Sequence, residues 1–109
     1  MGSITCIILT KNEEKNLPSA LQNAASWADE ILVVDSGSDD GTVEIAKKSG
    51  ASVIYRAWDG DFAAQRNFAL TGAHGDWVLY LDADERLTAG AIQKVLAIKK
   101  GAPNHHYSF

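Results

Sequence analysis

Short apolar runs alternate along this chain with segments whose apolar residues recur at helical spacing. The runs are Ile4–Leu9, Glu30–Val34, Ser52–Tyr55 and Trp77–Leu81. Strands that are apolar throughout are typical of a parallel sheet covered on both faces. Strands that alternate with helices are joined by crossover connections, which are right-handed. The alternation therefore predicts an α/β fold, a three-layer αβα sandwich with a mostly parallel sheet.

The segments between the runs have the spacing and the end signals of helices. Apolar helix faces are expected at Leu17, Ala20, Leu21, Ala24 and Ala28, along Phe62–Ala73, and at Ile92, Val95 and Leu96. The expected caps are Asn16, Ser38 or Asp39, Asp61 and Thr88, with a left-handed stop at Gly50. His105–Phe109 has the composition of a further strand.

The size and charge of the chain argue against several classes of protein. Its 109 residues fit one domain, 1–109, with a modest core. A formal net charge of -4 argues against a nucleic-acid binder, which usually carries a basic face. The apolar runs fall far short of the roughly 20 residues of a membrane span, and no signal peptide is visible. We expect membrane contact to be peripheral. The single cysteine, Cys6, is expected to be a buried thiol in a cytoplasmic protein.

Polar clusters follow three of the four runs, at the point where each expected strand ends. They are Thr10–Glu13, Asp35–Asp40 and Asp82–Glu85. In open parallel sheets, ligands bind outside the carboxyl ends of the strands. We therefore expect acid and amide side chains from three parts of the chain to converge on one edge of the sheet.

The pattern Asp82-Ala83-Asp84 predicts a metal site. In an extended segment the two aspartates point the same way, and two close carboxylates repel each other and raise one pKa. A divalent cation removes that conflict, and oxygen ligands select hard ions such as Mg²⁺ or Mn²⁺. The alternative interpretation is that both acids are turn residues that cap the next helix.

Asp35 and Arg66 each allow two interpretations. An aspartate after a strand often bonds nearby backbone groups in a turn, but Asp35 could instead accept a hydrogen bond from a base N–H or a ribose hydroxyl. An arginine on a helix is usually solvated, and Arg66 gains a ligand role only if its helix lines the nucleotide edge. We expect the histidines, His74, His105 and His106, to lie on the surface. We expect the tryptophans, Trp27, Trp58 and Trp77, to pack in the core or at its rim.

Four motifs occur in order along the chain: Thr10–Glu14, Val33–Thr42, Gln65–Asn67 and Leu81–Glu85. Together they closely resemble family 2 glycosyltransferases, in particular the bacterial branch that builds the lipopolysaccharide core and includes β-1,4-glucosyltransferases acting on heptose. The resemblance implies a Rossmann-like fold of the nucleotide-diphospho-sugar transferase type, with this chain as its N-terminal, donor-binding half. It also implies an inverting transferase that uses a nucleotide sugar, UDP-linked, and a divalent metal.

The resemblance assigns roles to individual residues. It implies that the nucleoside pocket is lined by Thr10, Lys11, Asn12 and Glu13. Asp35 would contact the uracil or its ribose, and Arg66 would approach the uracil or the diphosphate. Asp82 would contact the ribose or the metal. Asp84 binds the metal joined to the donor diphosphate, so that Asp82 and Asp84 form the metal site with Mg²⁺ or Mn²⁺.

Members of this family usually continue well beyond this length, and the continuation carries the acceptor site and the usual catalytic base. The resemblance thus predicts that the 109-residue chain binds the donor but does not transfer sugar, with Glu85 as the one candidate base. The expected acceptor is a glycolipid or saccharide, met at the cytoplasmic side of the inner membrane. An alternative is a non-catalytic nucleotide-binding or interaction module that retains the half-fold. Self-association is expected through an edge near Val78, Tyr80, Tyr107 and Phe109.

Overall fold

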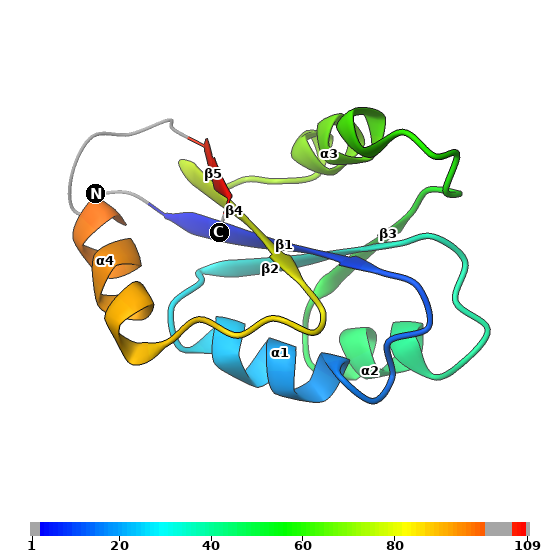
Figure 1. Ribbon diagram of the computed structural model, residues 1–109, viewed down its shortest axis with the longest axis horizontal. Helices are drawn as coiled ribbons and strands as arrows, with labels where there is room; N and C mark the ends of the chain where they lie inside the picture. The colour runs from blue at the N-terminus through cyan, green and yellow to red at the C-terminus, as the bar shows by residue number, and fades with distance from the viewer. Residues whose placement is uncertain (1–2, 100–105, 109) are drawn as a thin grey trace.

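Strands and helices alternate along the chain in a computed structural model, which describes residues 3–99 and 106–108 (Figure 1). The elements are β1 Ile4–Thr10, α1 Leu17–Ala25, β2 Glu30–Asp35, α2 Thr42–Lys48, β3 Ser52–Tyr55, α3 Phe62–Thr71, β4 Trp77–Asp82, α4 Ala89–Lys99 and β5 His106–Ser108. The expected strands are confirmed to within one residue, and the ends of the further strand, His105 and Phe109, lie outside the described residues. Two helices end earlier than the apolar spacing predicts, because α1 stops before Ala28 and α3 before Ala73.

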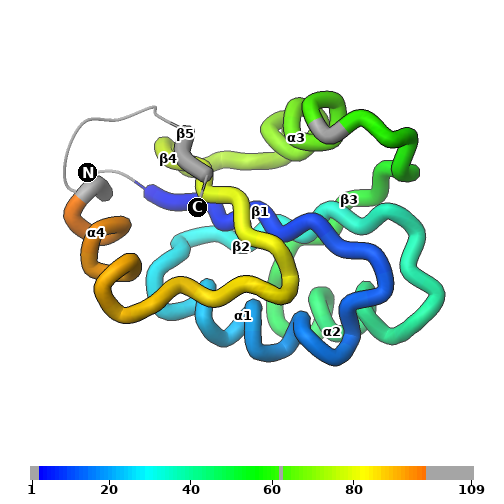
Figure 2. Tube along the Cα trace, viewed as in Figure 1, coloured from blue at the N-terminus to red at the C-terminus, as the bar shows by residue number. Residues whose placement is uncertain are grey.

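The sheet has the strand order β3-β2-β1-β4-β5, and every neighbouring pair is parallel. The chain first builds outward from β1 through β2 to β3, and then returns to the other side of β1 to place β4. β1 is therefore the central strand, visible as the blue tube in the middle of Figure 2. The gap between the two directions of growth, at the carboxyl ends of β1 and β4, is where ligands bind in sheets of this kind.

Helices cover both faces of the sheet, which confirms the predicted αβα layers (Figure 1). Alternate residues of β1 point to opposite faces. Cys6 and Ile8 pack in the larger core cluster with residues of α1, α2 and α4, while Ile7 packs in the smaller cluster with Ala69 of α3. All three β1 side chains are fully buried, which is why this strand is apolar throughout. The buried thiol expected at Cys6 is confirmed, and burial raises its pKa to about 12.

The helix ends agree in part with the predicted caps. The carboxylate of Asp61 accepts from the Ala64 N–H at 3.0 Å, the Thr88 hydroxyl accepts from the Ala91 N–H at 3.1 Å, and Gly50 has the left-handed φ of 90°. Asn16 occupies the cap position of α1, but its side chain makes no capping bond there. A proline in the first turn removes one of the N–H groups that a cap would satisfy.

Three further expectations need correction. Helix α2 is capped by neither Ser38 nor Asp39, because the loop extends to Gly41, which occupies the cap position and has no side chain to bond; before it, the carboxylate of Asp40 accepts from the Thr42 N–H at 3.0 Å. Leu96 is 36% exposed and does not share the buried face of α4 with Val95.

The third correction concerns the edge expected near Val78. That side chain is buried beneath α3, and β5 pairs with β4 through Val78 and His106. The edge of β4 is therefore covered within this chain, and self-association stays a prediction that rests on the outer strands. No described helix has the length and apolarity that a membrane span requires.

Candidate functional site

A cavity of about 690 Å³ lies at the carboxyl ends of the strands. Its walls come from the β1 end, the β2 end, the loop between β3 and α3, the helix α3 and the β4 end. The lining residues are Leu9, Thr10, Lys11, Glu13, Ser36, Ala57, Trp58, Gln65, Asp82, Ala83 and Asp84. The convergence predicted for three polar clusters is thus found, and the cavity lies at the switch point between β1 and β4.

The sheet register sets the order of the groups around this cavity. Leu9 is paired with Asp82 across β1 and β4, and Thr10 is paired with Asp35 across β1 and β2. The end of β1 therefore separates the acids of β4 from the loop that follows β2. One side of the cavity carries carboxylates, and the other carries hydroxyl, amide and aromatic groups.

Asp82 and Asp84 both line the cavity and are both exposed, whereas Ala83 between them is 3% exposed and packs in the core. The prediction that the two aspartates face the same space is therefore met. Its premise was partly wrong, because Asp82 ends β4 and Asp84 already lies in a turn. The buried methyl group of Ala83 anchors this turn, and the acids flank it.

The electrostatics of Asp82 reflect crowding by like charges. Burial and then the negative charges of Glu85 and Asp84 raise the pKa of Asp82 above its ordinary value. Arg66 opposes this rise, and Glu13 adds a small further contribution to it. An excess of carboxylates at one edge favours a bound cation, which relieves their repulsion.

Glu85 has a structural role at the end of β4. Its Oε1 accepts a hydrogen bond from the Asp82 N–H at 2.8 Å, and its own N–H donates to the Asp82 carbonyl at 2.9 Å. Glu85 is absent from the residues that line the cavity. These two bonds close the turn that carries Asp84.

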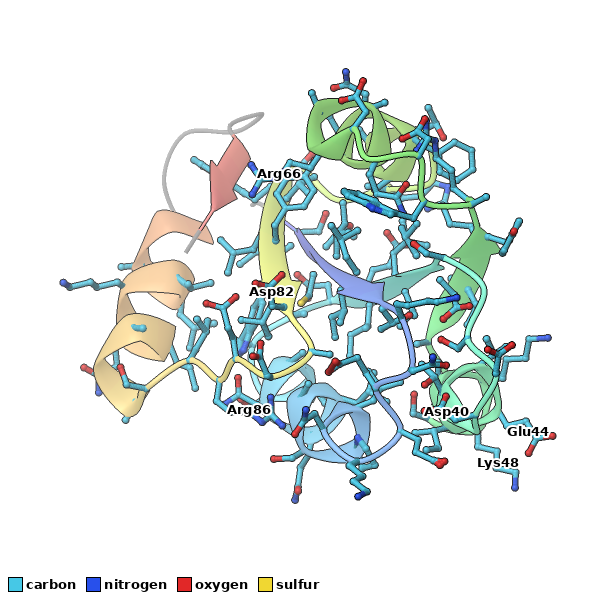
Figure 3. All side chains as sticks on the ribbon, turned by 45° about the vertical axis from the view of Figure 1, so that its right-hand side comes forward. Asp40, Glu44, Lys48, Arg66, Asp82 and Arg86 are labelled. Atoms are coloured by element: carbon cyan, nitrogen blue, oxygen red, sulfur yellow. The ribbon has the colours of Figure 1, made fainter. Side chains whose placement is uncertain are left out.

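Arg86 ties the same turn to helix α1, beside which it lies in Figure 3. Its Nη1 donates to the carbonyls of Ala83 at 2.8 Å and Glu85 at 2.5 Å. Its Nη2 donates to the Asn16 carbonyl at 2.7 Å, and its Nε donates to the Ser19 hydroxyl at 2.9 Å. One side chain thus joins the acid turn to the first turn of α1. The planar fork of donors makes arginine suited to this.

Asp35 is 2% exposed and organises the loop after β2. Its Oδ1 accepts from the hydroxyls of Thr10 at 2.8 Å and Ser38 at 2.6 Å, and its Oδ2 accepts from the N–H groups of Gly37 at 2.9 Å and Ser38 at 2.8 Å. Burial raises the pKa of Asp35, but these hydrogen bonds together lower it below its ordinary value. Asp35 does not line the cavity, and contact with uracil or ribose stays a prediction.

The segment after β1 is fastened to the loop after β2. The Lys11 ammonium donates to the Gly37 carbonyl at 2.6 Å. The Asn12 amide oxygen accepts from the Asp39 N–H at 2.7 Å. Thr10, Lys11 and Glu13 line the cavity, whereas Asn12, with a φ of 55°, does not. Of the predicted nucleoside pocket, three residues are therefore at the cavity and Asn12 braces its wall.

Arg66 reaches from α3 toward β4, the strand that carries Asp82 (Figure 3). Its guanidinium lies 4.9 Å from the ring centroid of Tyr80, within the range of a cation–π contact. Arg66 is exposed and lies outside the cavity lining. Its charge acts on Asp82, so it sits at the rim on the acid side.

The sequence reasoning missed the opposite wall of the cavity, formed by Ser36, Ala57, Trp58 and Gln65. Trp58 is 47% exposed, in contrast to the core packing of the other two tryptophans, and Gln65 is 1% exposed. Gln65 lies one turn before the buried Ala69 on α3. A glutamine on the buried stripe of a helix was the available signal, because a buried amide needs polar partners.

A metal at this site needs ligands beyond those that the described residues supply. Within residues 3–99 and 106–108, no three His, Cys, Asp or Glu side chains are grouped so that they could hold a metal ion. Asp82 and Asp84 supply two carboxylates. Such a pair matches the way Mg²⁺ binds with substrate phosphates and water as its remaining ligands.

Comparison with known proteins gives consistent matches. The model of a family described as glycosyl transferase family 2 matches residues 5–104. An uncharacterized glycosyltransferase of Rickettsia typhi is 44% identical over 88 residues, which cover 81% of this chain and 30% of that protein. A TPR repeat-containing protein of Synechococcus elongatus is 40% identical over 87 residues, which cover 80% of this chain and 22% of that protein.

Solved structures share the fold. The mannosyl-3-phosphoglycerate synthase of Rubrobacter xylanophilus has a TM-score of 0.69 and 27% identity over 80% of this chain and 32% of its own. The glucosyl-3-phosphoglycerate synthase of Mycobacterium tuberculosis, in complex with Mn²⁺, UDP and glucosyl-3-phosphoglycerate, has a TM-score of 0.65 and 25% identity over 78% of this chain and 36% of its own. The chain therefore spans between 22% and 36% of the length of these four proteins.

Proposed function

Because this chain belongs to glycosyl transferase family 2, we propose that its cavity binds a nucleotide-sugar donor, a UDP-sugar, together with a divalent cation. One observation carries the proposal: carboxylates and a hydroxyl–amide–aromatic wall face each other across a single cavity. A nucleoside diphosphate is complementary to both sides. Its anionic phosphates can share a cation with the carboxylates, and its base, which is flat and polar at the edges, suits the hydroxyl, amide and aromatic groups.

The acid side fits a hard cation. Asp82 and Asp84 offer only oxygen ligands, which suit Mg²⁺ and Mn²⁺. Burial, and after it the charges of Glu85 and Asp84, raise the pKa of Asp82, and a cation beside these carboxylates offsets their repulsion. When bound, the metal acts as a Lewis acid that stabilises the charge of the leaving nucleoside diphosphate. The two aspartates hold and orient this end of the donor.

Solved relatives support the choice of donor and metal. The glucosyl-3-phosphoglycerate synthase of Mycobacterium tuberculosis was crystallised with Mn²⁺ and UDP, and, in a match of 28% identity, with Mn²⁺ and UDP-glucose. We carry the nucleotide and the metal over to this chain as part of the proposal. The acceptors of those enzymes are not carried over.

The remainder of the reaction is proposed on the sequence motifs. The reaction inverts the anomeric carbon of the sugar, with a carboxylate base activating the acceptor hydroxyl. The acceptor is a glycolipid or saccharide of the bacterial surface, as in lipopolysaccharide synthesis. The base comes from a part of the full-length enzyme beyond the cavity described, or from Glu85 if its bond to the Asp82 N–H opens.

The test is a titration of the chain with UDP, with and without Mn²⁺, followed by calorimetry and by thermal melting. We expect Mn²⁺ to tighten UDP binding in the wild type and to have no effect on binding in Asp84→Asn. Ligand at 100 times its dissociation constant adds about 2.7 kcal/mol of stability, which for a domain of this size raises the melting temperature on the order of 10 °C.

The matched control is Glu44→Gln, which removes one negative charge from α2, away from Asp82 (Figure 3). This variant should bind Mn²⁺ and UDP like the wild type. A UDP affinity that Mn²⁺ leaves unchanged in the wild type would overturn the proposed metal–diphosphate site.

A further inference from the structure

A hydrogen-bonded chain of side chains runs behind the hydroxyl–amide wall of the cavity. It begins at Asp59, whose carboxylate accepts from Arg56 Nη2 at 2.9 Å. Arg56 Nη1 donates to the Gln65 Oε1 at 2.8 Å, and Gln65 Nε2 donates to the Ser36 hydroxyl oxygen at 3.0 Å. The chain links the loop after β3, the helix α3 and the loop after β2, and it ends at a residue that lines the cavity.

The direction of every bond in this chain is fixed by Arg56. A guanidinium has donors and no acceptor, so Gln65 must turn its carbonyl oxygen toward Arg56. Its NH₂ group then faces Ser36, whose oxygen must accept. The proton of the Ser36 hydroxyl has no acceptor within the described part of the chain. Ser36 therefore presents a hydrogen-bond donor to whatever occupies the cavity.

The position of Ser36 indicates which part of the donor it meets. Ser36 follows β2, and Asp82 ends β4, so the central strand β1 lies between them. Two strand spacings separate β2 from β4, roughly 10 Å. If the diphosphate is held at Asp82 and Asp84, the base extends toward Ser36, Ala57 and Trp58. These neighbours, one methyl group and one aromatic ring, suit a flat base.

We propose that the Ser36 hydroxyl, oriented by Gln65 and Arg56, donates a hydrogen bond to the C4 carbonyl oxygen of the base and so selects uracil over cytosine. The inference rests on the proposed function and deepens it. A pyrimidine with a carbonyl at C4 offers an acceptor, whereas cytosine places an amino donor there. With cytosine the Ser36 oxygen can accept only through its second lone pair, and the hydroxyl proton is then left without a partner in the base, which costs affinity.

Replacing Gln65 by glutamate reverses the chain. A carboxylate only accepts, so a Gln65→Glu side chain takes hydrogen bonds from both Arg56 and the Ser36 hydroxyl. The Ser36 proton is then no longer available to a C4 carbonyl oxygen, and both lone pairs of the Ser36 oxygen are free to accept from the amino group of cytosine. The new negative charge forms an ion pair with Arg56, which offsets the cost of burying it, so we expect the variant to fold.

The experiment measures the dissociation constants of UDP and CDP in the presence of Mn²⁺ and reports their ratio, in which general charge effects cancel. For the wild type we expect a preference for UDP of about tenfold or more. Ser36→Ala should bring the ratio close to one, and Gln65→Glu should shift it further toward CDP. Gln22→Glu adds the same charge on the exposed surface of α1 and should keep the wild-type ratio.

Three results would overturn the inference. The first is a wild type that binds UDP and CDP equally well, and the second is a Ser36→Ala variant with the wild-type preference for UDP. The third is a Gln65→Glu variant whose preference for UDP is not reduced. Melting curves establish that each variant is folded, and Ser36→Ala decides the matter if Gln65→Glu is unfolded. Failure of the wild type to bind either nucleotide with Mn²⁺ contradicts the proposed function itself. Binding of UDP without base selectivity contradicts only the role of Ser36.

Discussion

At the scale of single residues, Arg86 is important to the site although the sequence pattern assigned it no role. Its guanidinium makes four hydrogen bonds, two within the acid turn and two to the first turn of α1. The Glu85 bonds at the strand end and the buried Ala83 restrain the same turn. Arg86 therefore helps to hold the turn that carries Asp84, although Arg86 does not line the cavity.

We expect Arg86→Gln to weaken Mn²⁺ binding in the presence of UDP by about 10- to 100-fold, the usual effect of removing groups that orient metal ligands. Arg86→Lys should restore the charge but little of the affinity, because an ammonium cannot reproduce the planar fork. Binding of Mn²⁺, followed by electron paramagnetic resonance, is the measurement. Lys48→Gln, on α2, is the control for a lost positive charge. A folded Arg86→Gln variant with wild-type Mn²⁺ affinity would contradict the role.

Among the structural elements, two glycines show how differently the turns and helices are constrained. Gly75 lies between α3 and β4, and its N–H donates to the Thr5 hydroxyl at 2.8 Å. A Cβ at this position would lie 2.7 Å from both the backbone nitrogen and the hydroxyl oxygen of Thr5. Gly90 lies in α4, and a Cβ there would meet nothing within 4 Å.

We therefore expect opposite effects on the free energy of unfolding. Gly75→Ala should destabilise the chain by about 1 to 3 kcal/mol, because the turn must move away from β1. Gly90→Ala should stabilise it by about 0.5 to 1 kcal/mol, because alanine loses less backbone entropy in a helix. Denaturant titration gives both values. A neutral Gly75→Ala would show that this turn is looser than its contacts with Thr5 indicate.

For the whole molecule, we expect donor binding without sugar transfer by the 109-residue chain. The cavity contains groups for a nucleotide and a metal, but the one acid considered as a base, Glu85, is bonded to the Asp82 N–H and lies outside the cavity lining. General-base catalysis is worth about 10²- to 10⁴-fold, and positioning of the acceptor can add more.

The measurement is incubation of the chain with a UDP-sugar, Mn²⁺ and a heptose-containing lipid core, with product followed by mass. Transfer should stay at background. A rate of about 1 s⁻¹ or faster would contradict this expectation and would make Glu85→Gln the next variant to examine. The same assay on a longer relative with donor and acceptor segments serves as the positive control.

The sequence by itself determined the kinds of elements and the chemistry at their ends. The continuous apolar run of β1 follows from burial on both faces, seen at Cys6 and Ile7. The acids at 82 and 84 and the polar segment after β1 could be placed at strand ends because strand ends show in local composition. Local signals failed at the α2 cap, where Gly41 takes the position expected for Ser38 or Asp39, since a shift of two or three residues in a loop changes no periodicity.

Only the tertiary structure decided which strand ends are neighbours. Leu9 meets Asp82 because β4 returns to the side of β1 opposite β2, and no local pattern encodes that choice. The same holds for the wall that joins Ser36, Gln65 and Arg56, whose members come from three separate segments. The strand order is settled by the free energy of packing the whole sheet between its helices. That energy depends on contacts between residues far apart in the chain, which become visible only when the chain is folded.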